Sequence, residues 1–173
     1  EQLRQQSEPP ITRLDEVLRT VALEISPLIA QRDLDFGIHT EAAPVRAHEW
    51  MLRELTRNLL HNAVRHAPHG SELAVDLRCD AHHTALTISD CGPGIDPELA
   101  ARLFQPFSAG DVRSGSGLGL AICQEIVQAL GGSITLTNRE RGTRILGLDA
   151  VVRLPLAHHF ASAAHGNPAQ LSE

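Results

Sequence analysis

The order of elements along the chain predicts an antiparallel or mixed sheet with helices on one of its faces. Helix-like and strand-like segments alternate in the first half of the sequence, whereas pairs of consecutive strands dominate the second half. The clearest element is an amphipathic segment from Glu49 to His66, in which apolar residues recur at intervals of three and four. A chain of 173 residues is long enough for one domain with a sizeable core.

Periodicity and turn residues predict the individual elements. A polar linker over residues 1–10 precedes a short extended piece at Ile11, a helix that continues to Arg32 and a strand over 34–39. The helix Glu49–His66 ends at the Pro68-His69-Gly70 turn. The later elements are predicted as strands over 72–79 and 84–89, helices over 97–103 and 118–130, and strands over 133–137 and 143–154 around a turn at 138–142. We expect the domain to cover residues 11–156 and a disordered tail to cover 157–173.

Composition excludes several classes of protein. The formal charge of −6 argues against general nucleic-acid binding, and no apolar run approaches the roughly 20 residues that span a bilayer. Three cysteines without a CxxC pair favour reduced thiols and a cytoplasmic location; an inner-membrane anchor elsewhere in a longer protein stays open. All 15 basic residues are arginine, which excludes phosphate sites that require lysine, such as the Walker loop.

Three polar residues share one stripe of the helix Glu49–His66. Glu54, Asn58 and Asn62 are spaced four apart, so they can face one ligand together. A neutral amide oxygen in this position would suit Mg²⁺, which prefers oxygen ligands. Alternatively, each amide ties down a neighbouring loop.

A second candidate segment, Asp90-Cys91-Gly92-Pro93-Gly94-Ile95, directly follows a predicted strand. A carboxylate at the strand end can accept a hydrogen bond from an exocyclic amine such as adenine N6, and the glycines let the backbone approach the ring. The alternative is a turn in which Asp and Gly merely permit the geometry.

A third candidate segment is rich in glycine and enters a helix, where exposed amides and the positive end of the helix favour a phosphate chain. Its residues are Gly115, Ser116, Gly117, Leu118, Gly119 and Leu120. The alternative is a flexible hinge. Between the second and third segments, Phe104 and Phe107 flank the base of a polar stretch with Arg113, a composition typical of a lid or of an ordinary surface loop.

Taken in order, ELTRNLLHNAVRHA, DCGPGI, LFQPF and GSGLGLAI resemble the successive boxes of the histidine-kinase ATPase family, which shares its ATP-binding fold with gyrase B-type ATPases. The resemblance extends from about Ile11 to Leu156. It implies a two-layer α/β (α+β) sandwich of the Bergerat type, with a mixed, mostly antiparallel sheet behind and helices in front.

The resemblance also implies roles for individual residues around Mg-ATP. Asn62 is the magnesium ligand, Asn58 belongs to the same box, Arg65 reaches phosphate and His66 lies against the adenine. Asp90 reads the adenine amine, with Gly92, Gly94 and Ile95 beside the base and Thr143 approaching the pocket next to Asp90. The remaining nucleotide-binding positions are Phe107, Arg113 and the residues from Gly115 to Leu120.

The function that this resemblance implies is a kinase module of a two-component sensor. It would donate the γ-phosphate to a histidine on an upstream dimerisation domain that this chain lacks, with a response regulator as the later acceptor and a homodimeric full-length protein. Asn58 stands where hydrolases of the superfamily have Glu, and an amide cannot serve as general base, so transfer is favoured over hydrolysis. Two alternatives stay open: a regulatory nucleotide-binding module without transfer, and a serine kinase of the anti-sigma type.

Overall fold

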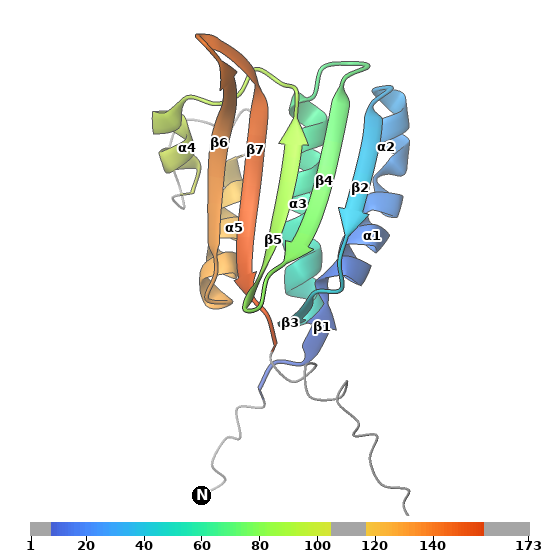
Figure 1. Ribbon diagram of the computed structural model, residues 1–173, viewed down its shortest axis with the longest axis vertical. Helices are drawn as coiled ribbons and strands as arrows, with labels where there is room; N and C mark the ends of the chain where they lie inside the picture. The colour runs from blue at the N-terminus through green and yellow to red at the C-terminus, as the bar shows by residue number, and fades with distance from the viewer. Residues whose placement is uncertain (1–7, 105–116, 158–173) are drawn as a thin grey trace, which may run out of the picture.

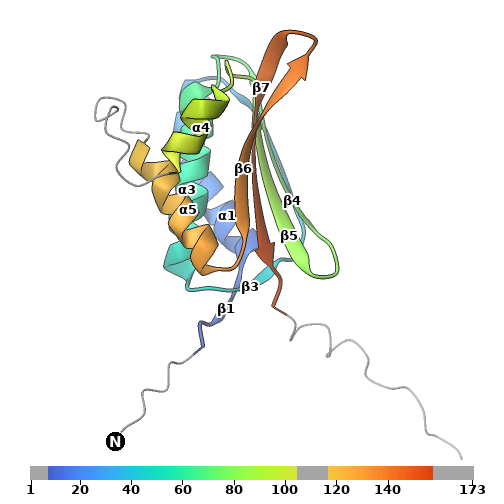
Figure 2. The same ribbon diagram turned by 90° about the vertical axis from the view of Figure 1, so that its left-hand side faces the viewer.

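A computed structural model of the protein describes residues 8–104 and 117–157. A five-stranded sheet in the order β2-β4-β5-β7-β6 forms one layer, and Figure 2 shows the helices α1, α3 and α5 covering one of its faces. The strands are β1 (Ile11–Arg13), β2 (Asp35–Thr40), β3 (Pro44–Arg46), β4 (Glu72–Cys79), β5 (His83–Asp90), β6 (Ser133–Arg141) and β7 (Arg144–Pro155). The helices are α1 (Leu14–Glu24), α2 (Ser26–Gln31), α3 (Glu49–His66), α4 (Pro97–Leu103) and α5 (Gly117–Ala129).

The sheet is mixed and mostly antiparallel, which confirms the predicted fold class. β2 runs parallel to β4, whereas β4–β5, β5–β7 and β7–β6 pair antiparallel (Figure 1). A parallel pair requires a crossover connection, and α3 supplies it between β2 and β4. The crossover places α3 across the middle of the sheet, behind β4 and β5 in Figure 1.

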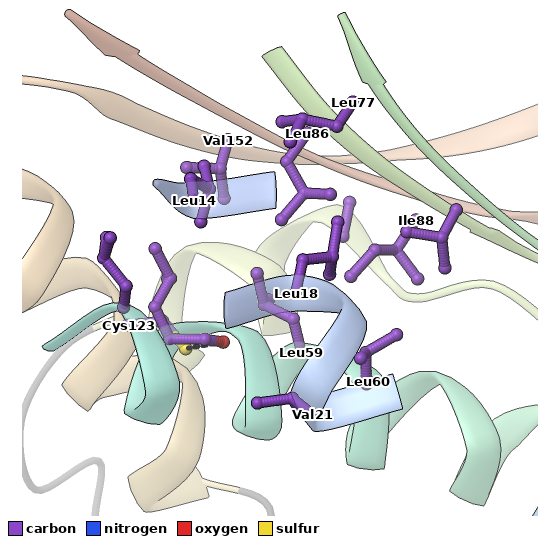
Figure 3. Close-up of a cluster of buried hydrophobic side chains, with 14 of the residues drawn as sticks. Leu14, Leu18, Val21, Leu59, Leu60, Leu77, Leu86, Ile88, Cys123 and Val152 are labelled. Atoms are coloured by element: carbon purple, nitrogen blue, oxygen red, sulfur yellow. Dashed lines mark hydrogen bonds between the residues drawn. The ribbon is translucent and has the colours of Figure 1, made fainter. Parts of the chain in front are cut away.

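The core lies between α3 and the covered face of the sheet. Leu52, Leu55, Leu59 and Leu60 of α3 are at most 2% exposed. Figure 3 shows side chains from the helices, among them Leu59 and Leu60, facing Leu77, Leu86, Ile88 and Val152 from three neighbouring strands. Burying a leucine side chain contributes about 1.5–3 kcal/mol, so this stripe fixes the rotation of α3 about its axis. Within the described residues, no helix, α3 included, has both the length and the apolar content to cross a membrane.

The extended piece predicted at Ile11 is β1, but the single helix predicted after it, up to Arg32, is wrong, because the chain breaks at Ile25 into α1 and α2. Pro27 has no N–H with which to continue the helical bonds, and its partner carbonyl would be that of Leu23. The Ser26 hydroxyl donates to that carbonyl instead, at 2.8 Å. Apolar spacing continues through this break, so periodicity alone does not reveal it.

Strand β3 was not predicted, and it joins the two ends of the described chain. The N–H of Ala47 donates to the carbonyl of Pro10 at 3.0 Å, and the N–H of Ala157 donates to Pro44 at 2.9 Å. Ala157, assigned above to the tail, is buried. The expected domain limits of 11 and 156 stay predictions, since residues 1–7 and 158–173 lie outside the described part.

The turn predicted at 138–142 lies further along the chain. β6 continues to Arg141, β7 starts at Arg144, and Gly142 turns the chain with a φ of 65°. Only Gly142 and Thr143 therefore form the turn. Both views show the turn end of this hairpin reaching beyond the other strands (Figures 1 and 2).

A partly buried ion pair fixes the start of α1. Arg13 donates to both carboxylate oxygens of Asp15, at 2.9 and 2.7 Å, and the N–H of Ala43 donates to Asp15 at 3.0 Å. Burial by itself would raise the pKa of Asp15, but the hydrogen bonds from Arg13 and Ala43 outweigh burial and hold the pKa below its ordinary value of 3.8. A lowered pKa means that the charged form stabilises the fold above the unfolded-state pKa, and that this stability is lost as the pH falls through the folded-state value.

We expect Asp15→Ala to lower the free energy of unfolding by about 1–3 kcal/mol at neutral pH, because it leaves the Ala43 N–H and the Arg13 guanidinium without their acceptor. The matched control is Asp76→Ala, which removes the exposed partner of Arg78 and should cost less than about 1 kcal/mol. Urea denaturation at neutral and acidic pH measures both variants. A cost for Asp15→Ala that does not shrink below the pKa of Asp15 would contradict the assignment.

Candidate functional site

Asp90 is the last residue of β5 and lies on the helix-covered face of the sheet. Every second residue of β5 is buried: Thr84, Leu86, Ile88 and Asp90. The two-residue period of a strand therefore carries a carboxylate into the same layer as the leucine core. Asp90 is only 4% exposed, and such burial is costly unless polar groups face the charge.

Two backbone amides face the Asp90 carboxyl group. The N–H of Gly92 donates to Oδ1 at 2.8 Å, and the N–H of Leu148 on β7 donates to the same oxygen at 3.3 Å. Burial raises the pKa of Asp90; the two amides and the charges of His66 and Arg139 only partly oppose this rise. Within the described part of the chain both hydrogen bonds end on Oδ1, which leaves Oδ2 for another donor.

The loop after Asp90 lies against the end of α3. A methyl group on Gly92 would come within 2.6 Å of the His66 carbonyl oxygen and 3.0 Å of Asp90 Oδ1. Only glycine permits this close approach of two backbones. Asp90 is thereby held beside the last turn of α3, one helical turn beyond Asn62.

The polar stripe of α3 has the composition of an oxygen-rich site. Glu54, Asn58 and Asn62 are each half-buried on the helix. Asn58 Nδ2 donates to the Glu54 carbonyl at 2.9 Å and to its carboxylate at 3.3 Å, so among the described residues Asn58 bonds within its own helix. In the described residues no hydrogen bond engages the Asn62 amide, so its oxygen is available to a metal.

The start of α5 lies against the same stripe. A methyl group on Gly119 would lie 3.1 Å from Asn58 Oδ1. The first turn of α5, whose N–H groups have no partner within the helix, therefore lies beside the Asn58 side chain. Two of the other predicted motifs, at the end of β5 and at the start of α5, therefore each lie against the predicted motif on α3.

Sequence reasoning missed two residues of β6 that hold the loop from Asp90 to Ile95. The Ile95 N–H donates to Asn138 Oδ1 at 2.8 Å, and Asn138 Nδ2 donates to the Ile95 carbonyl at 2.7 Å. Arg139 donates to the backbone carbonyl of Asp90 and to the Asp149 carboxylate. Both residues fall in the run that the sequence assigned to a turn, and no periodicity in that run identifies them.

The expectation that Thr143 approaches the pocket beside Asp90 is wrong. Thr143 is exposed in the β6–β7 turn, whereas the residue paired with Asp90 on β7 is Leu148. Five residues separate the two positions, roughly 16 Å of strand at about 3.3 Å per residue. Because the hairpin is long, Gly142 and Thr143 lie at its turn, away from Asp90. Gly147 and Leu148 lie beside the Asp90 carboxylate instead.

Some of the other expected site residues lie in the described part of the chain, and the rest lie outside it. Arg65 and His66 are exposed on the last turn of α3, and Gly94 and Ile95 follow Gly92 in the loop. Gly117, Leu118, Gly119 and Leu120 start α5. Phe107, Arg113, Gly115 and Ser116 lie outside the described residues, so their expected roles stay predictions.

The arrangement joins a carboxylate acceptor, an amide oxygen and the start of a helix. The carboxylate suits an amine donor, the amide oxygen suits a hard cation, and the N–H groups of the helix suit an anion. A purine nucleotide with its metal ion carries all three complementary groups.

Comparison with known proteins agrees with this geometry. Residues 47–158 match the family described as histidine kinase-, DNA gyrase B- and HSP90-like ATPase. The sensor protein QseC of Escherichia coli K12 is 34% identical over 133 residues, which cover 75% of this chain and 29% of QseC. The chain thus spans less than a third of that relative.

Solved structures share the fold. The mycobacterial sensor histidine kinase MprB has a TM-score of 0.74 and 27% identity, covering 86% of this chain and 97% of that structure. The histidine kinase ThkA, in a complex with the response regulator protein TrrA, has a TM-score of 0.70 and 25% identity, covering 85% and 42%. With a two-layer fold, a convergent polar site and a family match over most of its length, the chain belongs to the family of histidine kinase-, DNA gyrase B- and HSP90-like ATPases.

Proposed function

We propose that the chain is the Mg-ATP-binding catalytic module of a two-component sensor histidine kinase, which donates the γ-phosphate of ATP to a histidine on a dimerisation domain of a longer protein. The observation that carries this proposal is the contact of Gly92 with the His66 carbonyl, which holds Asp90 one helical turn from Asn62. Relatives that are 32–34% identical to the chain are named sensor proteins, which agrees with this role.

Asp90 would recognise adenine. Its Oδ1 is fixed by the N–H groups of Gly92 and Leu148, so Oδ2 would accept the exocyclic amine. Gly92 and Gly94 would bring the backbone close to the ring, and His66 would lie against it. A hydrogen bond to a charged acceptor contributes about 1.5–3 kcal/mol, which is enough to select adenine over a base with a carbonyl at this position.

Asn62 would hold Mg²⁺ through its amide oxygen, with phosphate oxygens and water as the other ligands. The donor fits, because the Asn62 side chain is half-buried and makes no hydrogen bond within the described part of the chain. The metal would neutralise charge on the phosphates during transfer. Arg65, Arg113, Gly115, Ser116 and the first turn of α5 would contact the phosphate chain.

The site favours transfer to another protein group over hydrolysis. Hydrolysis needs a base that accepts a proton from water, and the residue one turn before Asn62 is Asn58, an amide. The nearest carboxylate on the stripe is Glu54, two turns from Asn62, or about 12 Å at 1.5 Å per residue. Glu54 also accepts a hydrogen bond from Asn58 and pairs with Arg57 at 3.8 Å, so it faces its own helix.

The proposed partners follow from the chemistry and from the relatives. The phosphate acceptor is a histidine outside this chain, on a domain that would also make the full-length protein a homodimer. A response regulator would take the phosphate next. The structure of ThkA with the response regulator protein TrrA is a relative's precedent for that encounter.

We expect Asp90→Asn to weaken ATP binding by roughly ten- to a hundredfold, the equivalent of about 1.5–3 kcal/mol, because the amide presents N–H where the carboxylate accepted one. Thermal stability should not fall, since the variant removes a buried charge. Calorimetric titration with ATP measures the affinity. Asp80→Asn, at the opposite end of β5, is the control and should bind ATP as the wild type does.

The wild type and the Asp90→Asn variant should also differ in how their ATP affinity depends on pH. The raised pKa of Asp90 means that the carboxylate becomes protonated at a higher pH than an ordinary Asp, so wild-type ATP affinity should fall on mild acidification. The Asp90→Asn variant should lack that fall. An unchanged affinity in Asp90→Asn at neutral pH would refute the adenine assignment.

Asn62→Ala should remove the magnesium dependence of ATP binding. We expect the gain in ATP affinity on adding Mg²⁺ to drop by roughly tenfold, about 1.4 kcal/mol, because the metal loses its protein ligand. Titrations with and without Mg²⁺ measure that gain. His61→Ala, an exposed neighbour on α3, should keep the full dependence, and equal losses in both variants would argue against a ligand at Asn62.

Transfer is tested by adding the upstream segment of the longer protein to this chain with γ-labelled ATP. We expect an acid-labile label on a histidine of the segment. An acid-stable label on a partner protein would favour a serine kinase. ATP binding without any label would favour a regulatory module and contradict the proposal.

A further inference from the structure

We propose that Asn138 and Arg139, two neighbours on β6, are positioning residues that hold the loop beside the adenine pocket; this inference rests on the nucleotide site proposed above. We call the pair the β6 clamp. Neither residue belongs to the motifs that suggested the site. Both lie in the long β6–β7 hairpin, and together they hold the two ends of the loop from Asp90 to Ile95.

Asn138 holds the far end of the loop. Its amide accepts from the Ile95 N–H at 2.8 Å and donates to the Ile95 carbonyl at 2.7 Å, so one side chain satisfies both backbone groups of Ile95. Gly94, with a φ of 75°, lies directly on this amide. A methyl group there would come within 2.5 Å of Asn138 Oδ1 and 2.7 Å of Ile145 Cγ2.

The two hydrogen bonds of Asn138 lie beside a gap in the packing between the loop and β6. A groove of about 340 Å³ lies between the loop and β6, lined by Ile95, Pro97, Leu136, Thr137, Asn138 and Glu140. Ile95 also packs against the hydrophobic core, and the Asn138 amide adds the hydrogen bonds between the loop and β6.

Arg139 holds the near end of the loop. Its guanidinium donates to the Asp90 carbonyl and to Asp149 Oδ1, both at 2.5 Å, and to the Leu148 carbonyl at 3.3 Å. Arg139 is paired with Gly147 on the intervening strand. A methyl group on Gly147 would collide with the Asp90 carbonyl and lie 2.5 Å from Arg139 Nη2, so the guanidinium crosses β7 where there is no side chain.

The clamp acts on both groups that would meet the base. Arg139 fixes the backbone of Asp90, whose carboxyl would read the amine, and Asn138 fixes Gly94 and Ile95 beside the ring. A loop with two glycines loses conformational entropy when a ligand orders it, and hydrogen bonds at both of its ends reduce that loss. The clamp provides that order before the nucleotide arrives, which is the effect of preorganisation on affinity.

The test uses the 173-residue chain with Asn138→Ala and with Arg139→Lys. We expect each variant to bind ATP about tenfold more weakly, with GTP binding little changed, so the preference for ATP over GTP falls. Lys keeps the charge of Arg139 but cannot donate to two acceptors as a planar fork does. Arg141→Ala and Thr135→Ala, exposed residues of the same strand, are controls that should keep wild-type values.

Three measurements on each variant separate positioning from stability: the thermal midpoint, the ATP affinity and the ATP-to-GTP ratio. A lowered midpoint with unchanged ATP affinity and ratio would overturn the clamp and leave a purely structural role. If Asn138→Ala does not fold, Asn138→Asp decides, because it keeps the acceptor for the Ile95 N–H but loses the donor to its carbonyl. A wild-type chain without ATP affinity would overturn the proposed function and the clamp with it, whereas wild-type binding with unaffected variants overturns the clamp alone.

Discussion

The candidate site depends on one close approach between two backbones, the loop after β5 and the last turn of α3. Gly92 lies so near the His66 carbonyl that a methyl group on Gly92 would be only 2.6 Å from the carbonyl oxygen, which is too close for a side chain. The same glycine donates its N–H to Asp90, so one residue sets both the position of the loop and the orientation of the carboxylate. Since α3 is fixed by its buried leucines, the core of the domain determines where Asp90 lies relative to the amides on the helix.

The parts of the site that follow a regular period could be predicted from the sequence. The four-residue spacing of Glu54, Asn58 and Asn62 predicted one stripe on α3. The predicted start of α4 at Pro97 is also confirmed, and Asp96 caps it by accepting the Glu98 N–H at 2.8 Å. Buried and partly exposed residues alternate along β5, and this two-residue period places Asp90 on the buried face of the strand. In each case a local rule, either helical or strand periodicity or helix capping, is not overridden by tertiary contacts.

The parts that were missed depend on contacts across the sheet. Asn138 and Arg139 look like turn residues because they are polar and precede Gly142, yet the β6–β7 hairpin continues past them. Its end projects beyond the sheet, so no alternation of apolar residues marks it as a strand (Figure 2). Thr143 was misplaced for the same reason, since the register that puts Leu148 opposite Asp90 is a property of the paired strands and not of either sequence segment.

The orientation of one amide connects the proposed metal ligand on α3 with the start of α5, where the phosphate chain is proposed to bind. Asn58 Nδ2 is held by Glu54, which turns Oδ1 toward Gly119. An acceptor at that point faces the first turn of α5, where backbone N–H groups have no partner within the helix. Asn58 therefore presents oxygen to donors and cannot take a proton from water. In the proposed site, the residue one turn before Asn62 is therefore an amide and not a base, which agrees with transfer of the phosphoryl group to a protein side chain over transfer to water.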